Sequence, residues 1–328
     1  MLGVDIGGTK LAVGSVDASG RILATARAST PVREGPQRVL SLLIDLCKDV
    51  LAATLRQAGN YRVVAVGVGC GGPLDPERGI IYAPPNLPGW EEVHLAEDLT
   101  DRLGYPVYVE NDANAAALGE LRFGGGRGIK NFVYLTISTG IGSGIVIGGK
   151  LYRGENGNAG EIGHMCVAYD GRPCHCGSRG CLEAYASGPS VAMRAREAAA
   201  KDGNTLLLKL AGSVEAIRPE TVVAAVKQGD PLATRVWEET TFVLGVGIAN
   251  VINIFNPRLV LLGGGLTQAG DLLFAPVRRV ALSRAFARLT RVVDIVPASL
   301  GEMVGVLGAA AVAFDRLEQR VMNVGNVI

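Results

Sequence analysis

The 328-residue sequence has almost no net charge. Its 32 basic and 31 acidic side chains leave a formal charge of +1 at pH 7. Proteins that hold nucleic acid or an anionic membrane by electrostatic attraction carry a basic surplus, and this composition has none. The sequence therefore predicts neither a nucleic acid partner nor a membrane partner.

Long apolar runs are also lacking. The longest apolar helix candidate, Phe242 to Phe255, is too short to span a bilayer and contains Asn250 and Asn253. A secretory signal is not indicated, because Asp5 interrupts the region that a signal peptide keeps apolar. With 48% hydrophobic residues and a mean hydropathy of +0.28, we expect a compact globular protein of the cytoplasm.

Cysteine is scarce but concentrated. The chain has six cysteines, and three of them, Cys174, Cys176 and Cys181, lie within eight residues. Together with His164 they would supply three thiolates and one imidazole, a closed tetrahedral set typical of structural Zn²⁺. A disulfide is a poorer interpretation, because Cys174 and Cys176 are too close in sequence to bridge comfortably.

His175 lies between two of these cysteines and is the competing ligand. We favour His164, because the longer loop lets its ring approach from the opposite side. Its second ring nitrogen could then be held as a fixed hydrogen-bonding group. Glu161 and Glu183 flank the segment, so we expect a zinc-braced polar wall of Glu161, His164 and Glu183 facing a polyhydroxylated substrate.

The first glycine cluster follows an apolar strand at the start of the chain. Gly7, Gly8, Thr9 and Lys10 offer backbone N–H groups, a hydroxyl and an ammonium, which suit a phosphate group. Asp5, at the end of the strand, could hold Mg²⁺ through water. An ordinary hairpin turn is the alternative interpretation of this segment taken alone.

The pattern of strand, glycine turn and strand occurs a second time, with a strand at 131–137, a turn at 138–144 and a returning strand at 145–147. A duplicated hairpin indicates two like domains, each with a phosphate-binding turn. A third cluster, 263–265, suits the close approach of an adenine or ribose to the backbone. A long helix is expected at about 231–255.

We place the hinge between the domains near the glycine-rich joint at 124–128. The prediction is a small α/β domain at 1–122 and a large α/β domain at 123–304 with the zinc site. The closing helix at 305–320 would return to the small domain.

Asp112 lies between a strand at 107–109 and a helix running to about Phe123. One interpretation makes it a helix N-cap. The other makes it a general base that accepts a hydroxyl proton during phosphoryl transfer, with Asn111 orienting the same substrate. Both can hold, because a helix N-terminus keeps a carboxylate ionised. Asn86 lies in a proline-rich loop and could either form a turn or bind a sugar hydroxyl.

The most specific motifs are D-I-G-G-T-K at Asp5–Lys10, E-N-D at Glu110–Asp112, S-T-G-I-G-S-G at Ser138–Gly144 and the cysteine-rich segment that ends at Glu183. With these motifs the sequence resembles the ROK family of sugar kinases and repressors over essentially its whole length, and most closely the family's bacterial glucokinases. The resemblance implies an actin-like (ribonuclease-H-like) ATPase fold of two α/β domains that close around a cleft. It also implies an ATP-dependent hexose 6-phosphotransferase, with D-glucose as the favoured sugar.

The resemblance also assigns roles to individual positions. It implies that Asp112 is the catalytic base. The implied sugar contacts are Asn86, Asn111, Asp112, Glu161, His164 and Glu183. The implied nucleotide contacts are Gly7, Gly8, Thr9, Lys10, Thr139, Gly140 and Gly264, and the implied zinc ligands are His164, Cys174, Cys176 and Cys181. The sequence departs from the family at Cys70–Pro73, where relatives more often carry a proline-glycine-proline turn.

Several alternatives stay open at this point. Similar sets of polar side chains bind N-acetylglucosamine, N-acetylmannosamine, mannose or fructose in relatives, and polyphosphate replaces ATP in some of them. A sugar-sensing repressor is the alternative of a different class. Such relatives carry a helix-turn-helix domain before the first phosphate strand, whereas four residues precede Asp5 here, so we expect no DNA binding. The resemblance further implies a homodimer or homotetramer.

Overall fold

A computed structural model of the protein describes residues 1–57 and 61–325. Internal contacts divide the chain into two units. The first unit comprises residues 1–130, 144–159 and 298–328, and the second comprises 131–143 and 160–297. The grouping differs from the expected boundary at 123, because the chain passes back into the first unit at 144–159. The sequence also predicts a helix from Gly35 to Ala58 that ends at Gly59 and Asn60, and this end lies outside the described residues.

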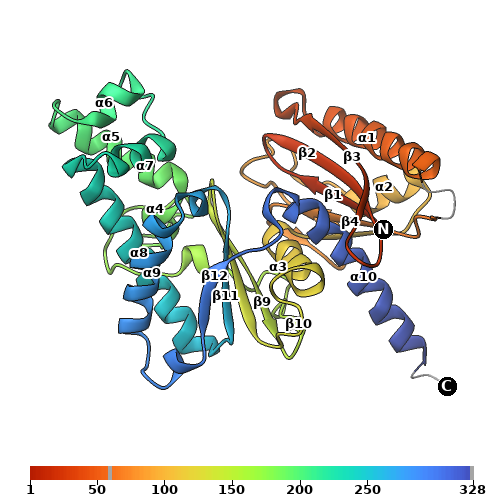
Figure 1. The fold of residues 1–328 in the computed structure, drawn as a ribbon. Helices are drawn as coiled ribbons and strands as arrows, with labels where there is room; N and C mark the ends of the chain where they lie inside the picture. The colour runs from red at the N-terminus through yellow and green to blue at the C-terminus, as the bar shows by residue number, and fades with distance from the viewer. Residues whose placement is uncertain (58–60, 326–328) are drawn as a thin grey trace. The chain divides into compact units, whose positions relative to one another are not determined.

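The first unit is built on a five-stranded sheet in the order β3-β2-β1-β4-β7 (Figure 1). Its strands are β1 (Leu2–Ile6), β2 (Lys10–Val16), β3 (Ile22–Ser29), β4 (Val66–Cys70) and β7 (Val107–Asn111). The first three are antiparallel neighbours, whereas β4 pairs in parallel with β1 and with β7. This register aligns Ile6, Cys70 and Asn111 at the carboxyl edge of the sheet. A small two-stranded sheet joins β5 (Leu74–Asp75) to β6 (Ile80–Ile81).

Helices cover both faces of this sheet. α1 (Pro36–Gln57) and α2 (Leu95–Leu103) share one apolar core with the buried side chains of β1, β2 and β4. α10 (Val304–Gly325) lies on the other face and packs against α3 (Asp112–Phe123). α10 approaches so closely that a Cβ at Gly3 or Gly67 would collide with its backbone carbonyl groups. The closing helix is thus part of the first unit's core.

The second sheet has the order β10-β9-β8-β11-β12, which repeats the arrangement of the first sheet. Its strands are β8 (Phe132–Ile137), β9 (Ile141–Ile147), β10 (Lys150–Leu151), β11 (Leu259–Gly263) and β12 (Asp294–Pro297). β11 pairs in parallel with β8 and β12. The glycine turn is shorter than expected, because Ile141 and Ser143 are buried and β9 already begins at Ile141.

The remaining α-helices belong to the second unit, where α8 packs along α9 (Figure 1). They are α4 (Glu183–Ala186), α5 (Gly188–Lys201), α6 (Leu206–Ala211), α7 (Pro219–Lys227), α8 (Pro231–Phe255) and α9 (Asp271–Arg284). Single 3₁₀ turns are η1 (Val32–Glu34), η2 (Ile162–His164), η3 (Gly265–Ala269), η4 (Leu289–Arg291) and η5 (Gly301–Met303).

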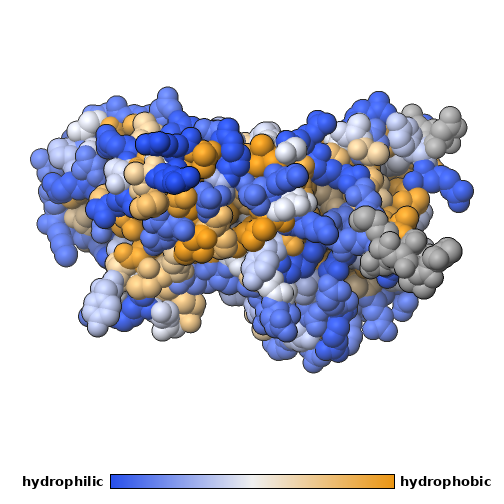
Figure 2. All heavy atoms as spheres, turned by 90° about the horizontal axis from the view of Figure 1, so that it is seen from below, coloured by the Kyte–Doolittle hydropathy of each residue, from blue (hydrophilic) through white to orange (hydrophobic). Residues whose placement is uncertain are grey.

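The surface seen in Figure 2 is largely hydrophilic, with smaller apolar areas between the polar side chains. Exposed apolar side chains of the second unit include Phe242, Ile254 and Phe286. Among the described residues, no helix has both the length and the apolar character that a bilayer crossing requires.

Candidate active site

Asp112 is the first residue of α3, directly after the carboxyl end of β7. The helix N-cap is Asn111, whose side-chain oxygen accepts hydrogen bonds from the N–H groups of Ala113 (2.9 Å) and Asn114 (3.2 Å). The interpretation of Asp112 as the N-cap is therefore wrong, because the extended backbone of Asn111 places the amide side chain in that position.

The carboxylate of Asp112 accepts a hydrogen bond of 2.8 Å from the N–H of Ala113. Solvent reaches the side chain, but the surrounding protein displaces much of its hydration, and this raises the pKa of Asp112. The Ala113 hydrogen bond opposes the rise without cancelling it. A carboxylate with a raised pKa is better suited to accept a proton than an ordinary surface aspartate.

The turn between β1 and β2 lies at the same edge of the first sheet as Asp112. The N–H of Gly7 donates to the carbonyl oxygen of Lys10 at 3.0 Å, which closes the turn. Gly8 lies against the loop that carries Asn86, and a Cβ at Gly8 would come within 2.8 Å of the Asn86 Cβ. The structure thus brings together the glycine turn, Asn86 and the Asn111–Asp112 pair within one unit.

Asp5 precedes this turn and has an unusual titration. Its pKa is raised to about 6, first by burial and then by the negative charge of Asp112, while Lys10 and Arg27 oppose the rise. The two carboxylates are therefore close enough to repel one another. A divalent cation beside Asp5 would relieve this repulsion, so the chemistry of the residues fits Mg²⁺.

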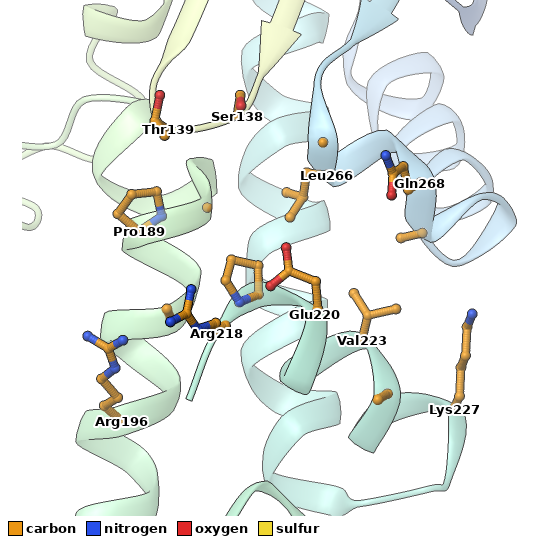
Figure 3. A pocket seen from close by; sticks show the side chains of 16 residues that line it. Ser138, Thr139, Pro189, Arg196, Arg218, Glu220, Val223, Lys227, Leu266 and Gln268 are labelled. Carbon is orange, nitrogen blue, oxygen red and sulfur yellow. The ribbon is translucent and has the colours of Figure 1, made fainter. Parts of the chain in front are cut away.

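In the second unit, the turn between β8 and β9 forms one wall of a cavity of about 680 Å³ (Figure 3). Ser138 and Thr139 lie at one end, and Pro189, Leu266 and Val223 contribute apolar surface. The polar and charged lining residues are Arg196, Arg218, Glu220, Lys227 and Gln268. The volume and the mixed lining are typical of a site for a nucleoside-sized molecule.

Of the nucleotide contacts expected in this unit, Thr139 lines the cavity, whereas Gly140 and Gly264 are not among its lining residues. Gly264 has φ +88°, and a Cβ there would collide with the carbonyl oxygen of Ile137. It therefore allows close packing of β11 on β8 beside the cavity. Sequence reasoning missed the lining residues on α5, α7 and η3, because nothing in their local pattern distinguishes them from ordinary helix surface.

The four proposed zinc ligands lie together in the second unit. One ligand atom each from His164, Cys174, Cys176 and Cys181 fall within 4.8 Å of one another. His164 Nδ1 is 3.7 Å from Cys174 Sγ, and Cys176 Sγ is 3.7 Å from Cys181 Sγ. Zn–S bonds of about 2.3 Å in a tetrahedron place two sulfurs about 3.8 Å apart, so the spacing fits zinc. The exposed His175 is not part of this cluster.

The polar residues beside the cluster have two different environments. His164 points Nε2 toward Glu161, whose Oε2 lies 3.9 Å away. Glu183 instead lies against the second glycine turn, where its Oε2 accepts a hydrogen bond of 2.8 Å from the N–H of Ile141. Glu183 therefore connects the end of the cysteine-rich segment to the turn that lines the cavity.

Comparison with known proteins decides the family. The sequence pattern of the ROK family matches residues 1–316. The chain belongs to the ROK family. This ROK protein is 38% identical over 317 residues to a glucokinase of Thermotoga maritima, with 97% of this chain and 98% of the glucokinase covered.

A solved structure extends the likeness of this ROK protein to the fold. It is a ROK family glucokinase from Streptomyces griseus, determined in complex with glucose and AMPPNP. The TM-score is 0.79 at 38% identity, with 94% of this chain and 97% of that chain covered. The prediction of an actin-like α/β fold is confirmed by this likeness.

The family also contains regulators. A xylose repressor of Caldicellulosiruptor bescii is 31% identical to this ROK protein over 316 residues, which are 96% of this chain and 78% of the repressor.

Proposed function

We propose that the protein phosphorylates a hexose with ATP and that D-glucose is its preferred sugar. The observation that carries the proposal is the first unit's sheet edge, where Asp112 and a glycine turn suited to phosphate lie at the same edge. The relatives named glucokinase, matched over nearly their whole length, support the choice of sugar and of reaction.

In the proposed reaction, the oxygen of the glucose 6-hydroxyl attacks the γ-phosphorus of ATP, and Asp112 accepts the proton of this hydroxyl. A new O–P bond forms, the bond from the γ-phosphorus to the bridging oxygen breaks, and ADP leaves with the electron pair. The proton remains on Asp112 until solvent removes it. Asn86 and Asn111 would orient the sugar, and the N–H groups of Gly7 to Lys10 would bind phosphate oxygens.

Mg²⁺, when bound beside Asp5, would neutralise charge on the phosphates. The cavity at Ser138 and Thr139 would take the nucleoside of the donor. Its apolar surface at Pro189 and Leu266 suits the faces of a purine, and its polar side chains could bind base or ribose.

Zn²⁺ would be held by His164, Cys174, Cys176 and Cys181 and would have a structural role, since four protein ligands leave no position for substrate. It would fix the imidazole of His164 so that this ring, Glu161 and Glu183 bind sugar hydroxyls. Thiolate ligands need a reducing compartment, which supports the cytoplasm as the location. A homodimer or homotetramer stays a prediction from the family.

The proposal is tested with the purified protein, Mg²⁺ and a panel of sugars and phosphate donors. The sugars are glucose, mannose, fructose, N-acetylglucosamine and N-acetylmannosamine, each offered with ATP and with polyphosphate. We expect the highest kcat/KM for glucose with ATP. Preference for another sugar would correct the substrate, and no phosphorylation of any sugar would refute the reaction.

A further inference from the structure

A completely buried carboxylate lies two residues before Asp112. The side chain of Glu110 is 0% exposed, at the end of β7. A buried charge is costly unless it is paired and hydrogen-bonded. Glu110 has such a partner in Arg153, whose Nε donates to Glu110 Oε2 at 2.7 Å and whose side chain is 17% exposed.

The second oxygen of Glu110 holds the turn that carries Asp112. Oε1 accepts hydrogen bonds of 3.1 Å from the backbone N–H of Asn111 and from the side-chain amide of Asn114. Asn111 in turn caps α3 by accepting hydrogen bonds from Ala113 and Asn114. A single carboxylate therefore fixes the residues on both sides of Asp112.

Arg153 connects this turn to two other segments of the same unit. Its backbone carbonyl oxygen accepts a hydrogen bond of 3.0 Å from Ala159, which closes the loop 153–159. A second guanidinium nitrogen lies 3.3 Å from Asp315 Oδ2 on α10, and Gln319 donates to the same oxygen at 2.8 Å. The loop leads directly to Gly160 and Glu161 in the sequence.

We propose that Glu110 and Arg153 are positioning residues for the transfer step, with Asp315 as their support on α10. This inference rests on the proposed function of Asp112. Glu110 and Arg153 do not touch the reacting atoms. Their pair fixes the direction of the Asp112 carboxylate, because the carboxylate of Glu110 binds the N-cap residue and the first turn of α3. Catalysis is sensitive to such placement, since a shift of about 1 Å can cost on the order of 100-fold in rate.

The test compares Glu110→Gln with the natural protein. The amide has a single accepting oxygen, so it cannot accept hydrogen bonds from Arg153 on one side and from Asn111 and Asn114 on the other, and its NH2 group must face one of these sets of donors. We expect kcat to fall about 10- to 100-fold, counted per ADP-binding site by calorimetry, with the KM for ATP changed less than about twofold. A merely structural role would reduce the number of binding sites or the Tm and leave kcat per site unchanged, and that result would overturn the inference.

Three further variants keep the test decisive if Glu110→Gln does not fold. Asp315→Asn removes a partly exposed partner of Arg153 and should lower kcat per site by about threefold, and Arg153→Lys should retain more activity than Arg153→Met. Unchanged kcat in folded Asp315→Asn together with equal activity of both Arg153 variants would contradict the role.

The matched control is Arg316, the neighbour of Asp315 on α10. Its side chain is 14% exposed and pairs at 2.7 Å with Glu77, which is not one of the residues that hold the Asp112 turn. Arg316→Met should change Tm but not kcat per site, and an equal fall in kcat would overturn the specific role of Arg153. A natural protein without sugar kinase activity would refute the proposed function as well, whereas normal kcat in Glu110→Gln refutes only the positioning role.

Discussion

Replacing Asp5 by Asn should stabilise the protein at neutral pH while it impairs catalysis. The folded state raises the pKa of Asp5 from 3.8 to about 6. The folded protein therefore binds its proton more tightly than the unfolded chain does, and stability falls as the pH rises from about 4 to about 6. Above that range Asp5 is ionised, and the loss of folding stability from its burial as a charged group is complete.

The size of this loss follows from the shift. Each pKa unit corresponds to about 1.4 kcal/mol, so a shift of about two units amounts to about 3 kcal/mol. Because the side chain is half-buried and partly hydrated, we expect Asp5→Asn to raise the free energy of unfolding by about 1 to 3 kcal/mol at neutral pH. The gain should vanish near pH 4, where the natural residue is protonated when folded.

Urea unfolding without Mg²⁺ or nucleotide measures this difference at about pH 4 and about pH 7.5. Asp45→Asn, at an exposed position of α1, is the control for the loss of one carboxylate. Mg²⁺ with ATP should then stabilise the natural protein more than Asp5→Asn. A variant that is less stable at pH 7.5, or equally stabilised at both pH values, would refute the reasoning.

Three other predictions concern the base, the metal and a glycine. Because the pKa of Asp112 is raised, kcat should fall as the pH drops through that raised pKa, which lies above 3.8; a flat acid limb in a pH–rate profile would count against the base. Zinc can be removed with a chelator or by Cys181→Ser, and either change should raise the KM for glucose about tenfold or more and the KM for ATP much less. Metal analysis verifies the loss of zinc, and steady-state kinetics measures both KM values. Unchanged kinetics after verified zinc loss would contradict the bracing role. Gly264→Ala should cost about 2 kcal/mol or more in urea unfolding, because its Cβ would meet the carbonyl oxygen of Ile137 at φ +88°; a neutral effect would argue against this packing.

Much of the fold could be predicted from local patterns. α8 begins and ends where the sequence indicated, because Asp230 caps its first turn by accepting a hydrogen bond of 2.7 Å from Ala233, and Asn256 ends it with a left-handed backbone. The repeated strand and glycine-turn pattern also corresponds to two sheets of the same strand order.

Features that depend on distant contacts were harder to predict. Both Asn111 and Asp112 can cap a helix, and the choice depends on backbone angles that the sequence does not encode locally. The residues at 144–159 group with the first unit through contacts such as that of Gly144 with Ala117 on α3. Charged cavity residues such as Arg218 acquire their place only when α7 packs against α5, α6 and α8.

The zinc ligands form an intermediate case. The short spacing of Cys174, Cys176 and Cys181 restricts where their sulfurs can lie, so the sequence is informative about three members of the set. The identity of the fourth ligand depends on whether the longer loop between His164 and Cys174 brings the His164 ring back to the sulfurs. In the structure His164 lies beside the sulfurs and His175 does not belong to the cluster, which supports the ligand set that we propose.

The most direct test of the account is the turnover of Asp112→Asn with ATP, Mg²⁺ and glucose. The variant keeps the size of the side chain and an oxygen that can accept the hydrogen bond from Ala113, so it should fold and bind ADP normally. We predict that kcat falls by about 100- to 10,000-fold, the usual contribution of a positioned base. Near-normal turnover in a correctly folded Asp112→Asn protein would contradict the central claim.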